Sequence, residues 1–251
     1  MSTIAPIRDA DLEFDHGTFD SAAFAAKSLA NWQSLAAVID HTLLKPEATR
    51  GQIENLCDEA VRYRFACAMV NPVWASAAVC MLAGTGVPAG VVIGFPLGAS
   101  LVSTLRHEAA ALVKLGAREL DMVIPIGLLK SGDYQSVDRT ISAAASVAHD
   151  GDALLKVILE TSLLNVEEKL RGAEIAIQAG ADFIKTSTGF STGGATAADV
   201  ALMRGVAGAR AGVKASGGIR TLADVKAMLE AGANRIGASA SVAIVRELGA
   251  E

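Results

Sequence analysis

Short apolar segments rich in Val, Ile and Leu alternate with segments of helical periodicity from about residue 30 to the end of the chain. This alternation is typical of repeated βαβ units, in which helices connect parallel strands. The apolar segments predict eight strands, at residues 39–43, 66–71, 90–95, 119–124, 154–160, 183–186, 213–216 and 235–238.

Three of the predicted helices end in the same dipeptide, Gly-Ala, shortly before a strand. It occurs at Gly116-Ala117, Gly180-Ala181 and Gly232-Ala233. Glycine adopts without steric cost the left-handed conformation that often terminates a helix. The dipeptide is therefore an internal repeat that marks the end of a helix.

Eight strand-helix units in a chain of 251 residues predict an α/β fold, a single (β/α)8 TIM barrel. The main alternative is a doubly wound open sheet, which would be expected to have a glycine-rich turn after its first strand. Residues 40–46 contain no glycine, and this favours the barrel. We expect residues 1–28 to be an N-terminal extension and residues 29–251 to form the barrel.

The composition, with 51% hydrophobic and 20% charged residues, is that of a globular protein. A net charge of −5 provides no general attraction for nucleic acid or anionic membranes, so neither is an expected partner. The longest nearly uncharged stretch, residues 87–101, is interrupted by Pro88 and Pro96 and does not predict a membrane helix. Acidic residues near the N-terminus argue against a signal peptide, and we expect a cytoplasmic protein.

The cysteines and histidines do not indicate a metal site. The three cysteines lack C-x-x-C spacing, and the four histidines form no H-x-H or H-E-x-x-H pair. We therefore expect chemistry without a metal or another cofactor.

Five ionisable residues interrupt the apolar strands, namely Asp40, Asp121, Lys156, Lys185 and Lys214. Both faces of a parallel barrel strand are covered, so a charge in mid-strand needs partners. A single such residue is readily explained by an ion pair or a strand end. Three lysines on three successive strands, however, place three ammonium groups near one mouth of the barrel, and this favours catalysis.

A crowded lysine is a better nucleophile than a free one. At pH 7 only about one free lysine in 2,500 carries a neutral amine, and a second ammonium about 5 Å away lowers the pKa by about 2 units. A neutral amine adds to a carbonyl to form an iminium ion, which stabilises a neighbouring carbanion. The lysines therefore indicate a metal-independent aldolase, without specifying which of them is the nucleophile.

Seven ordered segments resemble one enzyme family: IDHTLLK at 39–45, VNP at 70–72, IGFPLG at 93–98, ELDMV at 119–123, LKVILET at 155–161, FIKTSTGF at 183–190 and KASGGIRT at 214–221. On these segments the chain resembles the 2-deoxyribose-5-phosphate aldolases, which are class I, Schiff-base aldolases with a (β/α)8 barrel. The resemblance covers about residues 35–245.

The resemblance implies a role for each buried charge. Lys185 would form the Schiff base, Lys214 would lower its pKa, and Asp121 would exchange protons with Lys214. Lys156 and Asp40 would support them. The implied reaction, which needs no cofactor, is the reversible cleavage of 2-deoxy-D-ribose 5-phosphate to D-glyceraldehyde 3-phosphate and acetaldehyde, in deoxyribonucleoside degradation.

A phosphate site is predicted by position in the barrel. Gly217 and Gly218 follow the seventh strand, while Gly237 and Ser239 lie at the end of the eighth. In (β/α)8 barrels these two loops most often bind phosphate, through backbone N–H groups and a helix N-terminus. Some family members carry a lysine where this chain has Phe190, which reduces the side-chain charge available to a phosphate.

Two other functions remain open. The same lysines would serve a Schiff-base aldolase acting on another phosphorylated aldehyde or ketone. In a binding protein without catalysis they would be anion ligands only. We also expect a homo-oligomer, a dimer or tetramer, because apolar positions on the barrel helices are available for subunit contacts.

Overall fold

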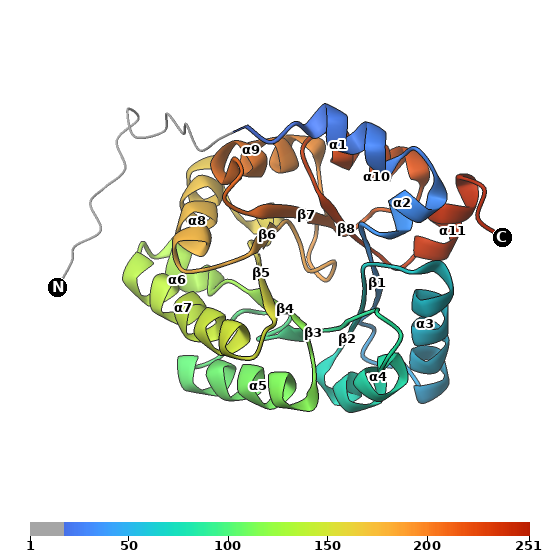
Figure 1. The fold of residues 1–251 in the computed structure, drawn as a ribbon. Coiled ribbons are helices and arrows are strands. Elements are labelled where there is room, and N and C mark those ends of the chain that lie inside the picture. Colours follow the sequence, from blue (N-terminus) through green and yellow to red (C-terminus); the bar gives the residue numbers. More distant parts are fainter. Residues whose placement is uncertain (1–17) are drawn as a thin grey trace.

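The computed structural model describes residues 18–251, in which parallel strands close into a single barrel in the order β1 to β8 (Figure 1). The predicted (β/α)8 fold is confirmed. The strands are β1 (Ile39–Leu43), β2 (Cys67–Val70), β3 (Ala89–Ile93), β4 (Glu119–Val123), β5 (Leu154–Ile158), β6 (Phe183–Lys185), β7 (Gly212–Ser216) and β8 (Arg235–Ala238).

Helices surround the barrel on all sides (Figure 1). They are α1 (Ser21–Ser28), α2 (Trp32–Ala36), α3 (Arg50–Tyr63), α4 (Ala75–Leu82), α5 (Val102–Leu115), α6 (Ile126–Lys130), α7 (Tyr134–Asp150), α8 (Val166–Gln178), α9 (Ala197–Ala207), α10 (Leu222–Glu230) and α11 (Ser241–Glu247). The glycines predicted to end three of them, Gly116, Gly180 and Gly232, have φ of 112°, 98° and 114°. Their left-handed conformation confirms the predicted helix ends.

Two of the predicted strands, 39–43 and 235–238, have the observed bounds, and the other six differ by one or two residues at one or both ends. Most differences are at the carboxyl ends, where the chain leaves the sheet while some backbone hydrogen bonds continue. Leu159 N–H, for example, still donates to the carbonyl of Lys185 at 2.9 Å although β5 ends at Ile158.

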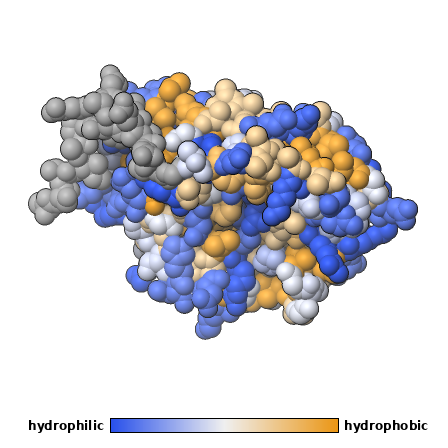
Figure 2. Space-filling model, turned by 45° about the horizontal axis from the view of Figure 1, so that its top comes forward, coloured by the Kyte–Doolittle hydropathy of each residue, from blue (hydrophilic) through white to orange (hydrophobic). Residues whose placement is uncertain are grey.

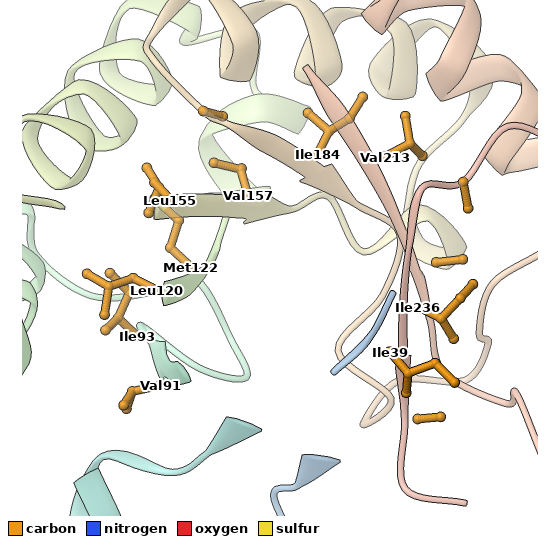
Figure 3. Close-up of a cluster of buried hydrophobic side chains, with 14 of the residues drawn as sticks. Ile39, Val91, Ile93, Leu120, Met122, Leu155, Val157, Ile184, Val213 and Ile236 are labelled. Atoms are coloured by element: carbon orange, nitrogen blue, oxygen red, sulfur yellow. The ribbon is translucent and has the colours of Figure 1, made fainter. Parts of the chain in front are cut away.

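The outward faces of the strands form the main hydrophobic core. In β4, Leu120 and Met122 alternate with Glu119 and Asp121, and both apolar side chains are fully buried. Figure 3 shows such residues from seven strands arranged around the barrel and pointing towards the helices. Since side chains alternate along a strand, the charged residues of β4 must face the barrel interior.

Glycines inside the barrel make room for large side chains. A Cβ on Gly212 would lie 2.2 Å from the ring of Phe183, and one on Gly90 would lie 2.5 Å from Met69 Cε. A Cβ on Gly237 would lie 3.1 Å from Lys214 Cε. The interior is therefore filled by pairing small residues with large ones, and the long lysine side chains belong to this packing.

The described part of the predicted extension packs on the barrel helices. Helix α1 lies against α10, and Ala25 and Ser28 are buried (Figure 1). The Phe19 ring lies 4.1 Å from the guanidinium carbon of Arg204 on α9. Residues 1–17, which the prediction also assigned to the extension, lie outside the described residues.

Hydrophobic and hydrophilic residues are interspersed on the face shown in Figure 2. Val73 and Leu101 have exposed fractions of 79% and 74%. None of the helices within residues 18–251 combines the length and the hydropathy needed to span a membrane.

Candidate active site

The five charges predicted from the sequence meet inside the barrel. Asp40, Asp121, Lys156 and Lys214 are completely buried, and Lys185 is 3% exposed. They come from β1, β4, β5, β6 and β7, and strand register places Asp121 beside Lys156 and Lys185 beside Lys214. The closed barrel thus turns five isolated sequence anomalies into one ionic cluster.

Asp121 lies at the centre of this cluster. Its Oδ1 contacts Lys156 Nζ at 2.8 Å, and its Oδ2 contacts Lys185 Nζ at 2.8 Å and Lys214 Nζ at 2.7 Å. Lys214 also forms a short ion pair with Asp40. The amino groups of Lys185 and Lys214 are neighbours because they share a single carboxylate oxygen.

Two further charged residues complete the cluster, and the sequence interpretation missed both. Glu119, at the start of β4, is 4% exposed and contacts Lys156 Nζ at 2.5 Å. Arg235, at the start of β8, lies 2.8 Å from Glu119 and 3.5 Å from Asp40. Both occupy the first residue of a strand, where a charge would ordinarily reach solvent. The spacing of Glu119 two residues before Asp121 was the available signal, because it places both on one face.

The cluster contains more basic groups than acidic ones. Lys156, Lys185, Lys214 and Arg235 face three carboxylates, those of Asp40, Asp121 and Glu119. A buried net positive charge is unfavourable, so the pKa of one basic group should fall.

The pKa of Lys185 lies below its usual value. Burial, together with the ammonium groups of Lys214 and Lys156, lowers its pKa from 10.5 to about 8, although Asp121 opposes the shift. Lys156 behaves in the opposite way, since Asp121, Asp40 and Glu119 outweigh its burial and raise its pKa well above the usual value. At pH 7 about a tenth of Lys185 therefore carries a neutral amine, whereas Lys156 stays protonated.

The carboxylates remain ionised. Burial alone would raise the pKa of Asp121, but the ammonium groups of Lys156, Lys185 and Lys214 hold it well below the usual range. Asp40 likewise has a pKa of about 2, because Lys156, Lys214 and Arg235 outweigh burial and the charge of Asp121. Both groups can accept protons from the neighbouring lysines.

A cavity of about 440 Å³ opens above the cluster. Of the three buried lysines, Lys185 alone lines it. The other lining residues are Thr42, Leu43, Leu44, Lys45, Thr188, Gly189, Phe190, Ser216, Gly217, Gly218, Ile219, Arg220, Gly237, Ala238 and Ser239. A molecule in this cavity can therefore reach the amine of Lys185, whose pKa is depressed.

The four residues predicted to bind phosphate all line the same cavity. Gly217 and Gly218 have φ of 87° and 82°, so a side chain at either position would be strained. Gly237 is also in contact with the lysine cluster, since a Cβ there would meet Lys214 Cε. The geometry thus gives Gly237 a packing function that its position in the sequence did not suggest.

Glu160 and Thr188 hold the loop that follows β6, and the sequence interpretation singled out neither. Glu160 is 2% exposed with φ of 58°, and its carboxylate accepts a short hydrogen bond from the Thr188 hydroxyl. Thr188 Oγ1 in turn accepts from Phe190 N–H at 3.0 Å. Phe190 stacks edge-on against Phe95 at 5.3 Å, and the loop thereby forms one wall of the cavity.

Within residues 18–251, one group of buried residues has donor atoms close enough for a metal. Ligand atoms of Asp40, Cys67 and Glu119 lie within 4.8 Å of one another. Lys156 Nζ, however, lies 3.4 Å from Asp40 and 2.5 Å from Glu119. Lys156, Lys214 and Arg235 therefore already pair with both carboxylates, and these residues do not fit a metal site.

The fold and the lysine cluster define a barrel suited to carbonyl chemistry at an amine, and comparison with known proteins specifies the family. A model of the DeoC/LacD family aldolases matches residues 10–247, and the chain belongs to this family.

Similar proteins have names that agree. A deoxyribose-phosphate aldolase of Geobacillus sp. (strain WCH70) is 53% identical over 171 residues, 68% of this chain and 76% of that one. One from Thermoanaerobacter sp. (strain X514) is 55% identical over 172 residues, 68% of this chain and 77% of that one. The tetrameric deoxyribose phosphate aldolase of Aeropyrum pernix superposes with a TM-score of 0.84 at 35% identity, over 91% of this chain and 96% of that one.

Proposed function

We propose that this protein is a deoxyribose-phosphate aldolase, a lyase that reversibly cleaves 2-deoxy-D-ribose 5-phosphate into D-glyceraldehyde 3-phosphate and acetaldehyde in deoxyribonucleoside catabolism. The observation that carries the proposal is that Lys185, the buried amine with a pKa of about 8, is the only cluster lysine that lines the cavity. The names of the similar proteins support the choice of substrate.

The reaction begins at Lys185. Its Nζ lone pair attacks the C1 aldehyde of the open-chain sugar, and loss of water from the carbinolamine leaves an iminium ion. A base then removes the C3 hydroxyl proton, the C2–C3 bond breaks, and its electron pair moves into the iminium to give an enamine. Glyceraldehyde 3-phosphate departs at this stage. Protonation of the enamine at C2 and hydrolysis of the resulting iminium release acetaldehyde and regenerate the amine.

Proton transfer is assigned to Asp121 and Lys214. Asp121 is ionised and contacts both Lys185 and Lys214, so a proton can pass between either lysine and the carboxylate. Lys156 and Asp40 keep the charges of this network in place. The sugar phosphate is assigned to Gly217, Gly218, Gly237 and Ser239, which line the same cavity.

Borohydride trapping tests the nucleophile. Reduction during turnover of 2-deoxyribose 5-phosphate should attach the substrate carbon chain covalently to Lys185, as located by peptide mass spectrometry. Lys185→Met should lose the label and at least a thousandfold in kcat. Lys114→Met, which removes an exposed lysine from α5, is the matched control and should keep both.

The trapping experiment also separates the alternatives. An unlabelled wild-type protein that still binds the sugar phosphate would support a binding protein without catalysis. Labelling and cleavage with a ketose phosphate, but not with deoxyribose 5-phosphate, would support an aldolase of different specificity.

A homo-oligomer and a cytoplasmic location are also part of the proposal. The Aeropyrum pernix relative is described as tetrameric, and Val73 and Leu101 offer exposed apolar side chains for subunit contacts. Light scattering with size-exclusion chromatography measures the oligomeric state, and cell fractionation measures the location.

A further inference from the structure

Two exposed cationic side chains, Lys45 and Arg220, line the cavity above Lys185. None of the cavity-lining residues in the described range 18–251 is acidic. Neither side chain forms an ion pair within that range. The upper cavity therefore has a positive charge that the surrounding side chains leave largely uncompensated.

Lys45 is the less compensated of the two cations. The carboxylate of Asp224 accepts a hydrogen bond from Arg220 N–H at 3.0 Å, and the charge of Arg220 contributes to lowering the pKa of Asp224. The carboxylate of Asp224 on α10 thus partly balances the positive charge of Arg220. Within residues 18–251, the amino group of Lys45 forms no hydrogen bond or ion pair.

The backbone of Lys45 is held in a defined turn. The carbonyl of Leu44 accepts a hydrogen bond from Asn71 Nδ2 at 2.9 Å, and the carbonyl of Lys45 accepts one from Ala48 N–H at 3.1 Å. Leu44 and Ala48 are both buried. The turn fixes where the flexible lysine side chain starts, at the rim of the cavity.

The barrel order places Lys45 next to the predicted phosphate loops. Strands β7, β8 and β1 are consecutive neighbours in the closed barrel, and His41 is the register partner of Ala238. Gly218 follows β7, Ser239 follows β8 and Lys45 follows β1, so all three residues lie at the carboxyl ends of adjacent strands. Each of them lines the cavity.

A phosphate monoester carries nearly two negative charges at neutral pH, and backbone N–H groups supply only dipoles. The chain as a whole has a net charge of −5, so the compensating charge must be local. Phe190, on the wall formed by the β6 loop, offers none.

We propose that Lys45 binds the phosphate group of the substrate and sets the preference of this enzyme for phosphorylated over unphosphorylated sugars. The inference rests on the proposed function and assigns to this chain a specificity residue on the β1 loop. Lys45 supplies from the β1 loop the positive charge that the glycine loop after β7 lacks.

The test compares two substrates that differ only in the phosphate, 2-deoxyribose 5-phosphate and 2-deoxyribose. Lys45→Met keeps the length of the side chain and removes its charge. The ratio of kcat/KM for the phosphorylated substrate to kcat/KM for the unphosphorylated one should fall about 10- to 100-fold, the usual effect of losing one charge-assisted hydrogen bond. Lys45→Arg should retain most of the ratio, and Lys114→Met should leave it unchanged.

Calorimetry with inorganic phosphate gives a second readout that does not depend on turnover. Phosphate should bind the wild-type protein and Lys114→Met alike, and Lys45→Met at least tenfold more weakly. An unchanged substrate ratio together with unchanged phosphate affinity in Lys45→Met overturns the inference. Failure of the wild-type protein to cleave either sugar refutes the proposed function instead, and calorimetry then still decides the role of Lys45.

Discussion

Removing the ammonium group of Lys214 should return the reactive amine to its protonated form. In Lys214→Met the buried cluster would keep Lys156, Lys185 and Arg235 opposite three carboxylates, so protonation of Lys185 would balance the charge. The carboxylates keep partners in this variant. Asp121 still contacts Lys156 and Lys185 at 2.8 Å, and Asp40 lies 3.4 Å from Lys156. We therefore expect the barrel to fold.

The size of the effect follows from the geometry. Lys185 Nζ and Lys214 Nζ lie 2.8 Å and 2.7 Å from one oxygen of Asp121, so they are at most about 5.5 Å apart. At an effective dielectric constant of about 20, their repulsion is about 3 kcal/mol, or about 2 pKa units. Loss of the repulsion would raise the pKa of Lys185 from about 8 towards 10. The neutral fraction at pH 7 would then fall about 100-fold.

The pH dependence of borohydride trapping measures this shift directly. In the wild-type protein the rate of labelling should rise with pH and level off above about 8, because only the neutral amine attacks. In Lys214→Met the rise should move about 2 units higher, so that labelling recovers at pH 10. Turnover should fall further than labelling, because proton transfer through Asp121 and Lys214 is also lost. A Lys214→Met protein that folds and still titrates near pH 8 would refute the crowding argument.

Two other substitutions test features of the barrel interior and of the helix layer. Gly237→Ala places a Cβ 2.9 Å from Ser216 Cβ and 3.1 Å from Lys214 Cε. We therefore expect the free energy of unfolding to fall by about 1–3 kcal/mol and kcat to fall about tenfold. Normal activity would show that Lys214 can move without consequence. Arg204→Met removes hydrogen bonds of 2.8 Å, 2.7 Å and 3.0 Å to the carbonyls of Gly232, Gly208 and Ala211, and urea unfolding should show a loss of about 3 kcal/mol. A loss below 0.5 kcal/mol would mean that water replaces the guanidinium at these carbonyls.

Sequence patterns alone predicted the fold, and they predicted five of the seven charged residues of the cluster. The β-branched segments and the repeated Gly-Ala helix ends predicted the closed barrel, because both follow from local conformational preferences. The lysines and aspartates in mid-strand predicted the site, because a charge there is costly without partners. Glu119 and Arg235 were missed since the first residue of a strand is ordinarily solvated.

The loop after β6 could not be predicted for a different reason. Glu160 adopts φ of 58°, a left-handed conformation that a non-glycine residue rarely takes. No pattern in the neighbouring sequence predicts it. Its partner Thr188 is 28 residues away along the chain. The contact arises only from tertiary structure, as does the selection of Lys185 by the cavity, which the spacing of the lysines left open.

The cluster links closure of the barrel to the onset of reactivity. Its charges come from β1 and β8, the first and last strands, as well as from β4 to β7. During synthesis, an incomplete chain lacking β7 and β8 has neither Lys214 nor Arg235, so Lys185 remains an ordinary protonated amine. Nascent and misfolded molecules therefore lack the activated amine, which forms only when the last strands complete the barrel.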